Sequence, residues 1–290
     1  MLEIQHLSKQ YSAQVRAVDD LSLSLQSGVV GLIGHNGAGK TTLMQMIATL
    51  SKPSSGSIRF QGSDILKQPD AIRQRLGFLP QDFGVYPNLS ALELMQYFAA
   101  LKGVRNPARI RSLLELVNLT EHAKRNAAQF SGGMRRRLGI AQALLNDPDI
   151  LIVDEPTAGL DPEERLRFRN LLAELGQQKL VIMSTHIVSD VESVAQQLAI
   201  MRQGRLIAFA TPDQLISAAR GKIWQVRLSL AEYESSKAQL QVLQAQRQDG
   251  MMQLRLAHPA QPFSQAELAE PDLEDALMAQ PYSLQEPAHV

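Results

Sequence analysis

Residues 34 to 42 combine glycines, a lysine and two threonines in a pattern suited to bind a nucleoside triphosphate. The stretch reads Gly34-His35-Asn36-Gly37-Ala38-Gly39-Lys40-Thr41-Thr42. Glycines let the backbone approach a phosphate closely and adopt positive φ, so that successive N–H groups can point at its oxygens. Lys40 would add a mobile charge near the outer phosphates, and Thr41 would offer a hydroxyl to Mg²⁺. The competing interpretation is a glycine-rich turn with a chance lysine.

The residues on either side of this loop favour the phosphate site. Gly28–Ile33 is a short apolar segment, typical of a strand, and it leads into the loop. After the loop, apolar residues recur with helical spacing, at Leu43, Met44, Ile47 and Leu50. A helix that begins at the loop would direct its positive end at the bound anion.

Two adjacent carboxylates form a second candidate group. Asp154 and Glu155 directly follow Ile150–Val153, a continuously apolar segment expected to be a parallel strand buried on both faces. The carboxyl edge of such a sheet is where these folds place their ligands. Burial of two acids side by side requires cations, which Mg²⁺ and Lys40 would supply. We expect Asp154 to hold Mg²⁺ through water and Glu155 to accept the proton of an attacking water. An ordinary exposed turn is the alternative.

A third candidate is Ser131-Gly132-Gly133, which precedes a segment with helical apolar spacing. A serine hydroxyl and two flexible N–H groups at the start of a helix can form a second anion site. Because the phosphate loop lies far away in the sequence, this second site could serve the nucleotide of another molecule. The same residues also fit a plain serine-capped helix after a turn.

Hydrophobic periodicity predicts the elements that must position these residues. Alternation within Leu2–Leu25 predicts an N-terminal antiparallel β layer, and strands are expected at 57–62, 76–80, 150–153 and 180–183. Pro162 should begin a charged helix that runs to about Leu175. Two amphipathic helices over about 91–118, inside a helical insert at about 82–146, are predicted from Leu92, Met95, Phe98, Leu101, Ile110, Leu113, Leu114 and Val117. Together these elements predict an α/β core with a parallel sheet.

Residues 1–218 are expected to form this domain, and residues 219–290 a small α+β accessory domain. After a short helix beyond Thr211-Pro212, the segments 223–228 and 252–256 alternate, and the polar segment 231–248 between them is prone to form a helix. We therefore predict a βαβ-like appendage. Its tail is rich in proline, alanine and glutamine and is expected to be loosely ordered at its extreme end.

Composition restricts the partners. Lys plus Arg total 29 against 29 Asp plus Glu in 290 residues, so the zero net charge gives no global basic field to gather nucleic acid. The absence of cysteine excludes disulfides and thiolate metal sites. No secretory signal is visible, and no apolar run approaches the roughly 18 to 20 residues that span a bilayer. We expect a chain that reaches a membrane only through a partner.

Taken in order over about residues 1–215, these motifs resemble the nucleotide-binding subunits of ABC transporters. The phosphate loop, the signature Ser131-Gly132-Gly133 and the acidic strand correspond to motifs of that family. Further matches are Gln81 after Phe78-Leu79-Pro80, the loop Ala158-Gly159-Leu160-Asp161, and His186 after Ser184-Thr185. Tyr11 corresponds to the aromatic residue that stacks on adenine. Each of these alone has a plain structural interpretation, and their order makes independent accidents improbable.

The resemblance implies a P-loop NTPase core and an ATPase that uses ATP and Mg²⁺. It implies a head-to-tail dimer of identical or similar subunits. Ser131 and Gly133 of one subunit would contact the terminal phosphate of the ATP held by Lys40 and Thr41 of the other. The zero net charge and the family agree that no nucleic acid partner is expected.

The resemblance also assigns roles to the remaining matches. Asp161 would cross the dimer seam, and His186 would touch the terminal phosphate. Gln81 would join the Mg²⁺ site to the helical insert, which faces an integral membrane permease. The subunit would then lie at the cytoplasmic side of the membrane, held there by its permease partner.

Two stretches look like those of exporter subunits, which work with short permeases that move drugs, lipids or polysaccharides outward. They are residues 79–90 and the ending Pro271-Asp272-Leu273-Glu274-Asp275-Ala276-Leu277. The signature departs from the family pattern, because Phe130 replaces the usual leucine and Met134 the usual glutamine. The lost amide bears on the fine adjustment of closure. The following Arg135, Arg136 and Arg137 form either a solvated face or a border of the nucleotide.

Two other classes of function compete with transport. A soluble ABC-type ATPase that acts on ribosomes or DNA would usually have two cassettes in one chain or a long coiled-coil insertion, and neither is visible. A regulator that binds nucleotide without hydrolysis is disfavoured by Glu155 and His186.

Overall fold

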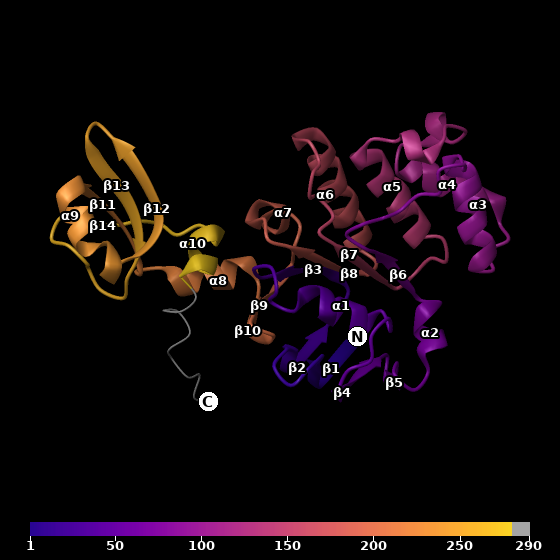
Figure 1. Ribbon diagram of the computed structural model, residues 1–290, viewed down its shortest axis with the longest axis horizontal. Helices are drawn as coiled ribbons and strands as arrows, with labels where there is room; N and C mark the ends of the chain where they lie inside the picture. The colour runs from indigo at the N-terminus through magenta and orange to yellow at the C-terminus, as the bar shows by residue number, and fades with distance from the viewer. Residues whose placement is uncertain (280–290) are drawn as a thin grey trace. The chain divides into compact units, whose positions relative to one another are not determined.

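The computed structural model describes residues 1–279 and divides the chain into two compact units. The first unit extends from Met1 to Phe209, and the second begins at Ala210 (Figure 1). The sequence predicted the division at 218/219. The structure instead assigns the whole helix α8 (Pro212–Ala219) to the second unit.

A six-stranded sheet in the order β10-β9-β3-β8-β7-β6 forms the centre of the first unit. Its five parallel strands are β9 (Gln197–Arg202), β3 (Gly28–Ile33), β8 (Leu180–Thr185), β7 (Ile150–Asp154) and β6 (Leu76–Leu79). Strand β10 (Arg205–Ala210) lies at the edge. Every residue of β3, β7 and β8 is buried, as the continuous apolar sequences predicted. The carboxyl ends of the parallel strands therefore meet at one edge of a rigid sheet.

The predicted N-terminal antiparallel layer is a second sheet in the order β2-β1-β4-β5. Its strands are β1 (Leu2–Gln10), β2 (Arg16–Leu25), β4 (Ser55–Phe60) and β5 (Ser63–Asp64). Helix α1 (Lys40–Ile47) lies between this layer and the central sheet in Figure 1, and its apolar residues join one core with side chains of both sheets. Leu50, predicted to belong to this helix, follows its end and is 65% exposed, because Thr49 adopts positive φ.

Helices cover the other face of the central sheet. Helix α6 (Pro162–Gly176) begins at Pro162 as predicted and packs on β3 and β8. The helical insert contains α3 (Ala91–Leu101), α4 (Pro107–Leu116) and α5 (Gly132–Ala143), which pack on one another, with α5 also against β6 (Figure 1). The shorter helices are α2 (Pro69–Arg73), α7 (Val188–Glu192), and the 3-10 turns η1 (Thr120–His122) and η2 (Ala127–Gln129).

The two amphipathic helices of the insert are present, but Leu101, predicted to share a face with Leu92 and Met95, is not buried. Leu94, Met95 and Ala99 are buried, whereas Leu101 is 66% exposed. Steps of three residues rotate by about 300° around a helix, so each step falls about 60° short of a full turn. After three such steps Leu101 lies on the side opposite Leu92. The pattern i, i+3, i+4 gives the buried face correctly.

The second unit is a four-stranded sheet in the order β12-β13-β11-β14. The strands are β11 (Ile223–Ser229), β12 (Gln241–Gln248), β13 (Met251–Ala257) and β14 (Glu267–Leu268), and the three pairings are antiparallel. Helix α9 (Leu230–Ser236) packs on β11 and β13, and the 3-10 turn η3 (Lys237–Gln239) follows it. Helix α10 (Leu273–Met278) packs on α8, and Arg255 of β13 binds the buried carboxylate of Asp275 with two hydrogen bonds from Nε and one from Nη2.

The α+β class predicted for this unit is confirmed, but the βαβ-like order is wrong. Residues 241–248 form strand β12 rather than the second half of a helix, and β11 pairs directly and antiparallel with β13. Strand pairing overrides the helix preference of the glutamines. The turn Asp249-Gly250, with positive φ at both residues, is a hairpin signal present in the sequence. The expected loose order of the extreme tail concerns residues 280–290, outside the described residues.

Two strands of the central sheet were not predicted. They are β9 and β10, joined by the turn Gln203-Gly204, in which both residues have positive φ. Within residues 1–279, no helix is both long enough and apolar enough to cross a membrane.

Candidate functional site

The glycine loop follows β3, and its last three residues, 40 to 42, form the beginning of α1, as the sequence predicted. Gly39 precedes the helix with φ of 101°, and a Cβ there would lie 2.2 Å from the carbonyl oxygen of Ala17. A Cβ on Gly34 would lie 2.4 Å from the carbonyl oxygen of Met201. These two positions therefore need glycine for conformation or space. The N-terminus of α1 faces the loop, so the unpaired N–H groups of its first turn are available to an anion.

Lys40 is held inside this loop. Its Nζ donates hydrogen bonds to the carbonyl oxygens of Gly34 at 2.6 Å and His35 at 3.2 Å, and the residue is only 6% exposed. Burial lowers the pKa of Lys40, while the charges of Glu155 and Asp154 act in the opposite direction. The ammonium hydrogen-bonds neutral carbonyls of the loop, so a phosphate would supply a counter-charge in direct contact with this buried cation.

Asp154, the last residue of β7, is joined to both the loop and β8. Its Oδ2 accepts a hydrogen bond from Thr41 Oγ1 at 3.0 Å, and its Oδ1 accepts one from Ser184 Oγ at 2.5 Å. The same Ser184 hydroxyl accepts a hydrogen bond from the N–H of Glu155 at 2.9 Å. A hydroxyl and a carboxylate are thereby fixed side by side. Oxygen donors of this kind suit Mg²⁺, which typically takes one or two protein ligands and completes its shell with water and phosphate.

Within the described residues 1–279, no group of three or more His, Cys, Asp and Glu side chains is arranged to hold a metal by itself. The Thr41–Asp154 pair thus fits a metal that arrives with a phosphate ligand.

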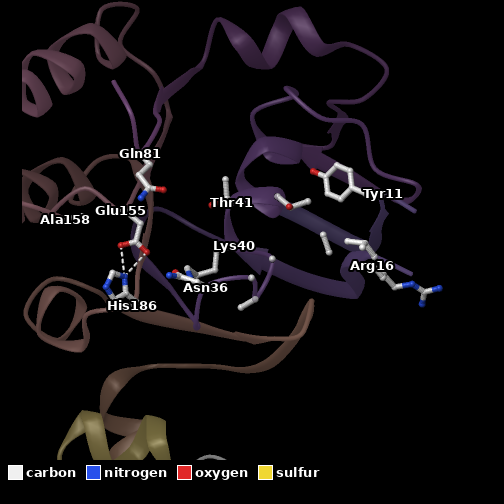
Figure 2. Close-up of a pocket in the computed structure, with 15 residues that line it drawn as sticks. Tyr11, Arg16, Asn36, Lys40, Thr41, Gln81, Glu155, Ala158 and His186 are labelled. Carbon is white, nitrogen blue, oxygen red and sulfur yellow. Dashed lines mark hydrogen bonds and ion pairs between the residues drawn. The ribbon is translucent and has the colours of Figure 1, made fainter. Parts of the chain in front are cut away.

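Glu155 and His186 face each other where β7 and β8 end. The His186 Nδ1 lies 2.9 Å from Oε2 and 3.1 Å from Oε1 of Glu155, and Figure 2 shows the pair at one side of the pocket. Glu155 is nearly buried, and its φ of 47° is in the left-handed region, which is uncommon for a non-glycine residue. Backbone strain of this kind gathers at functional sites. Arg136 of α5 stabilises the turn by donating to the carbonyl oxygens of Glu155 and Ala158.

A pocket of about 420 Å³ joins most of the predicted site residues. Figure 2 shows Tyr11 at the side of the pocket opposite Glu155 and His186, with Lys40 between them. Tyr11 is 57% exposed, and Lys9 Nζ lies 5.1 Å from the centroid of its ring, so the ring still has exposed surface on which a base can stack. The pocket is lined by Tyr11, Val15, Arg16, Ala17, Asn36, Gly37, Ala38, Gly39, Lys40, Thr41, Thr42, Gln81, Glu155, Ala158 and His186. Gln81 reaches it because β6 ends two residues earlier, beside β7.

The signature residues and Asp161 do not line this pocket. Ser131 caps α5 by accepting a hydrogen bond from the N–H of Met134, and both Ser131 and Gly132 are exposed. Asp161 caps α6 by accepting from the N–H of Glu164. The sequence interpretation of Ser131 as a helix cap is therefore correct as local structure, and a role toward a nucleotide requires a second molecule.

Two contributors were not identified from the sequence alone. The sequence indicates Ser184 only as a neighbour of His186, yet its hydroxyl orders both acids. The sequence alone does not decide the role of the three arginines after the signature. In the structure Arg136 holds the turn at Glu155, Arg137 forms an ion pair with Glu164 at 3.1 Å, and Arg135 is exposed. A serine or arginine of this type gives no periodic signal, because its partners are distant in sequence.

The chain is similar to known ATP-binding proteins of transporters. The family model for ABC transporters matches residues 18–158. The ATP-binding protein NatA of Bacillus subtilis (strain 168) is 38% identical over 214 residues, covering 72% of this chain and 87% of NatA. The Nod factor export ATP-binding protein I of Cupriavidus metallidurans is 38% identical over 226 residues, covering 76% of this chain and 74% of that protein.

A solved structure of the ATP-binding cassette MJ0796, a dimer in a post-hydrolysis state with ADP and Pi, has a TM-score of 0.66 and 25% identity. It covers 73% of this chain and 98% of the cassette. These findings support the transport interpretation over an ATPase that acts on ribosomes or DNA. The phosphate loop, the acid pair and these relatives together lead to one conclusion: this chain belongs to the ABC transporter family, as an ATP-binding subunit with ATPase activity.

Proposed function

We propose that the chain is the motor of an exporter, in which two copies close head-to-tail around two MgATP and drive a permease. The observation that carries this proposal is the unequal placement of the predicted site residues. Lys40, Thr41, Glu155 and His186 converge in one pocket, while Ser131 lies outside it on an exposed helix start. One copy thus holds a phosphate-binding site formed by the glycine loop and Lys40, here called the cradle. Elsewhere it holds a second helix terminus that can bind an anion. A second copy placed head-to-tail would bring the two together.

The cradle binds the triphosphate through the loop backbone and Lys40. Lys40 would leave the carbonyl oxygens of Gly34 and His35 and turn its ammonium to the outer phosphates, which offset the cost of burial. Tyr11 stacks on the adenine and contributes on the order of 1 kcal/mol, the value typical of aromatic pairs. Asn36 and the backbone from Gly37 to Thr42 line the phosphate end of the pocket.

Thr41, Asp154 and Gln81 would hold Mg²⁺, with Asp154 acting through water. The hydrogen bond between Thr41 and Asp154 and the burial of Asp154 support this assignment. The bound metal would neutralise charge that develops on the phosphates during transfer. Gln81 is the only one of the three at the border of the helical insert, since it follows β6 and precedes α3. It therefore also connects the nucleotide to the insert.

Glu155 acts as the base that takes a proton from the attacking water. Its carboxylate lies against His186 and inside the pocket, and its backbone is fixed by Ser184 and Arg136. His186 holds the carboxylate in position and contacts the terminal phosphate. A base that is anchored on both its side chain and its backbone can be aimed at one water.

The second copy completes the site with Ser131, Gly132 and Gly133. Their hydroxyl and N–H groups at the start of α5 suit the terminal phosphate, and Asp161 at the start of α6 crosses the seam. Identical copies and two similar subunits both satisfy this arrangement.

The permease contacts the helical insert at the cytoplasmic side of the membrane. An exposed apolar group beyond Gln81 supports this, because Tyr86 is 49%, Tyr97 41% and Leu101 66% exposed. The rings of Tyr86 and Tyr97 pack edge to face, 5.4 Å apart. Exposed aromatic clusters are typical of protein interfaces. The outward direction rests on the export named for the Cupriavidus relative.

The substitution Glu155→Gln tests the proposal. It keeps the size of the side chain and removes the base, so ATP binding should persist while turnover falls by roughly 10²- to 10⁴-fold. The trapped protein should dimerise when MgATP is added, as measured by light scattering, and wild-type protein purified from membranes should bring a polytopic partner. Near-normal turnover in Glu155→Gln would remove Glu155 from this role, and recovery with ribosomes or DNA alone would exclude transport.

A further inference from the structure

A buried polar cluster behind the active site takes no part in the scheme above. Asp190 of α7 has no exposed surface. Its Oδ2 accepts a hydrogen bond from Thr157 Oγ1 at 2.5 Å. Its Oδ1 is also buried and has no hydrogen-bond partner within residues 1–279. A fully buried carboxylate with one unsatisfied oxygen destabilises the fold, so a functional role is expected to offset its cost in free energy.

The group that faces this oxygen is the guanidinium of Arg165 on α6. Arg165 Nε lies 3.8 Å from Asp190 Oδ1, and it too is buried and without a hydrogen-bond partner among the described residues. A hydrogen bond between such groups has a length of about 2.7 to 2.9 Å. The donor and the acceptor therefore stand about 1 Å too far apart, and a small displacement of α6 relative to α7 would satisfy both.

The cluster joins the three segments that carry the proposed catalytic and seam residues. Thr157 follows Glu155 by two positions, and Asp190 follows His186 by four. Arg165 lies one helical turn after Asp161, and its backbone N–H donates a hydrogen bond to the carbonyl oxygen of Asp161 at 2.9 Å. A second link runs in parallel, because Arg169 of α6 donates to the carbonyl oxygen of Ser189 at 2.7 Å.

We propose that Asp190 is a positioning residue that couples the Glu155–His186 pair to the start of α6. In the ATP-closed dimer, Asp190 binds Thr157 with one carboxylate oxygen and Arg165 with the other. Closure of the Arg165 pair moves the first turn of α6, and with it Asp161, into its place at the seam. This inference rests on the proposed function, since the position of Asp161 matters only where a second copy completes the site.

The substitution Asp190→Asn tests the coupling. Asparagine keeps the shape, and its carbonyl oxygen can still accept from Thr157, but its NH₂ group would then face the Arg165 donor and prevent closure. Nucleotide affinity of the monomer should stay within about twofold, because no cradle residue is changed. The value of kcat should fall roughly 10- to 100-fold, the range for groups that orient catalytic residues.

Asp149→Asn is the matched control. Asp149 is also paired with an arginine, through Arg75 Nε at 2.6 Å, but it precedes β7 at the end away from the acids. Its kcat should equal that of the wild type. A purely structural role for Asp190 would lower thermal stability and leave the kcat of the folded protein unchanged, which would overturn the proposal.

The substitution Arg165→Gln removes the other partner of the ion pair. It should disturb folding less than Asp190→Asn, because the Arg165 side chain is partly exposed. It should reproduce the loss of kcat, and the double variant with Asp190→Asn should be no slower than either single variant, since both remove one interaction. If the two losses in kcat multiplied in the double variant, the coupling would be contradicted. Failure of both single variants to fold would make the cluster structural only and would also overturn the proposal.

The Glu155→Gln background separates this inference from the proposed function. If Glu155→Gln alone remains monomeric with MgATP in light scattering, the proposed dimer fails. If it dimerises, Glu155→Gln with Asp190→Asn should need at least tenfold more ATP or protein to do so. Equal dimerisation of the two proteins would refute the role of Asp190 while leaving the dimer intact.

Discussion

Replacement of Ser184 by alanine should damage stability and catalysis together, because its one hydroxyl serves two parts of the active site. Ser184 has no exposed surface. Its Oγ donates to Asp154 Oδ1 at 2.5 Å and accepts from the N–H of Glu155 at 2.9 Å. Alanine would leave a buried carboxylate oxygen and a buried N–H group without these partners.

The magnitude follows from the two lost partners. A buried polar group left unsatisfied costs about 1 to 3 kcal/mol, so the loss of both partners should lower the free energy of unfolding by about 2 to 6 kcal/mol. Glu155 sits at positive φ, and the Ser184 bond is one of the contacts that hold its backbone. The value of kcat should fall roughly 10- to 100-fold as the acids lose their orientation. The KM for ATP should change less, because the phosphate loop is untouched.

Urea unfolding and steady-state ATP hydrolysis at saturating MgATP measure the two effects. Ser8→Ala is the control, since Ser8 Oγ accepts one hydrogen bond, from the N–H of Asp20 at 3.0 Å, in the antiparallel layer. It should cost about 1 kcal/mol of stability and leave kcat unchanged. A Ser184→Ala protein with the stability of the control and the kcat of the wild type would refute the reasoning.

Three further predictions concern the loop and the helical insert. Lys40→Ala should weaken ATP binding in a titration, and unchanged affinity would contradict the cradle. Burial lowers the pKa of Lys102 to about 8, so its charge opposes folding fully below pH 8 and progressively less as pH rises toward 10.5. The substitution Lys102→Met should therefore raise the free energy of unfolding by at most about 3 kcal/mol at pH 7, as measured by urea unfolding, and by less at pH 10. A stabilisation that does not depend on pH would contradict this prediction. The substitution Gly139→Ala should lower the free energy of unfolding by about 1 to 3 kcal/mol, because its Cβ would lie 2.5 Å from Leu79 Cδ1 and 3.0 Å from Phe83 Cγ. An unfolding temperature equal to that of the wild type would contradict this prediction.

The positions of the site residues could be predicted because each follows a strand. The glycine loop, Gln81, Glu155 and His186 come directly or within two residues after β3, β6, β7 and β8, and Asp154 is the last residue of β7. Parallel strands place their carboxyl ends at one edge, so continuous apolar segments in the sequence suffice to bring these residues together. The burial predicted for strands β7 and β8 is confirmed for the same reason, since a strand buried on both faces has a continuous apolar sequence.

Contacts between distant side chains could not be predicted in this way. The hydroxyl of Ser184, the guanidinium of Arg136 and the carboxylate of Asp190 act through partners on other elements, and their neighbours in sequence do not indicate them. Strand β12 was missed for a related reason, because its glutamines favour no strand locally and only pairing with β13 defines it. The Asp249-Gly250 turn was the available signal.

The bonds of Arg136 link the ATP site of one copy to the part of α5 that is proposed to contact the nucleotide of a second copy. Arg136 belongs to α5, whose first residues are proposed to contact the nucleotide of the second copy, and it binds the carbonyl oxygens of Glu155 and Ala158 in its own copy. Burial lowers the pKa of Arg136, and the nearby charges of Asp82, Glu155 and Asp154 oppose this shift. In the proposed dimer, the nucleotide held by the second copy displaces α5 of the first copy. Through Arg136 this displacement is transmitted to Glu155, the base that acts on the nucleotide held by the first copy. Hydrolysis at the two sites should then be coupled even where the two nucleotides do not touch.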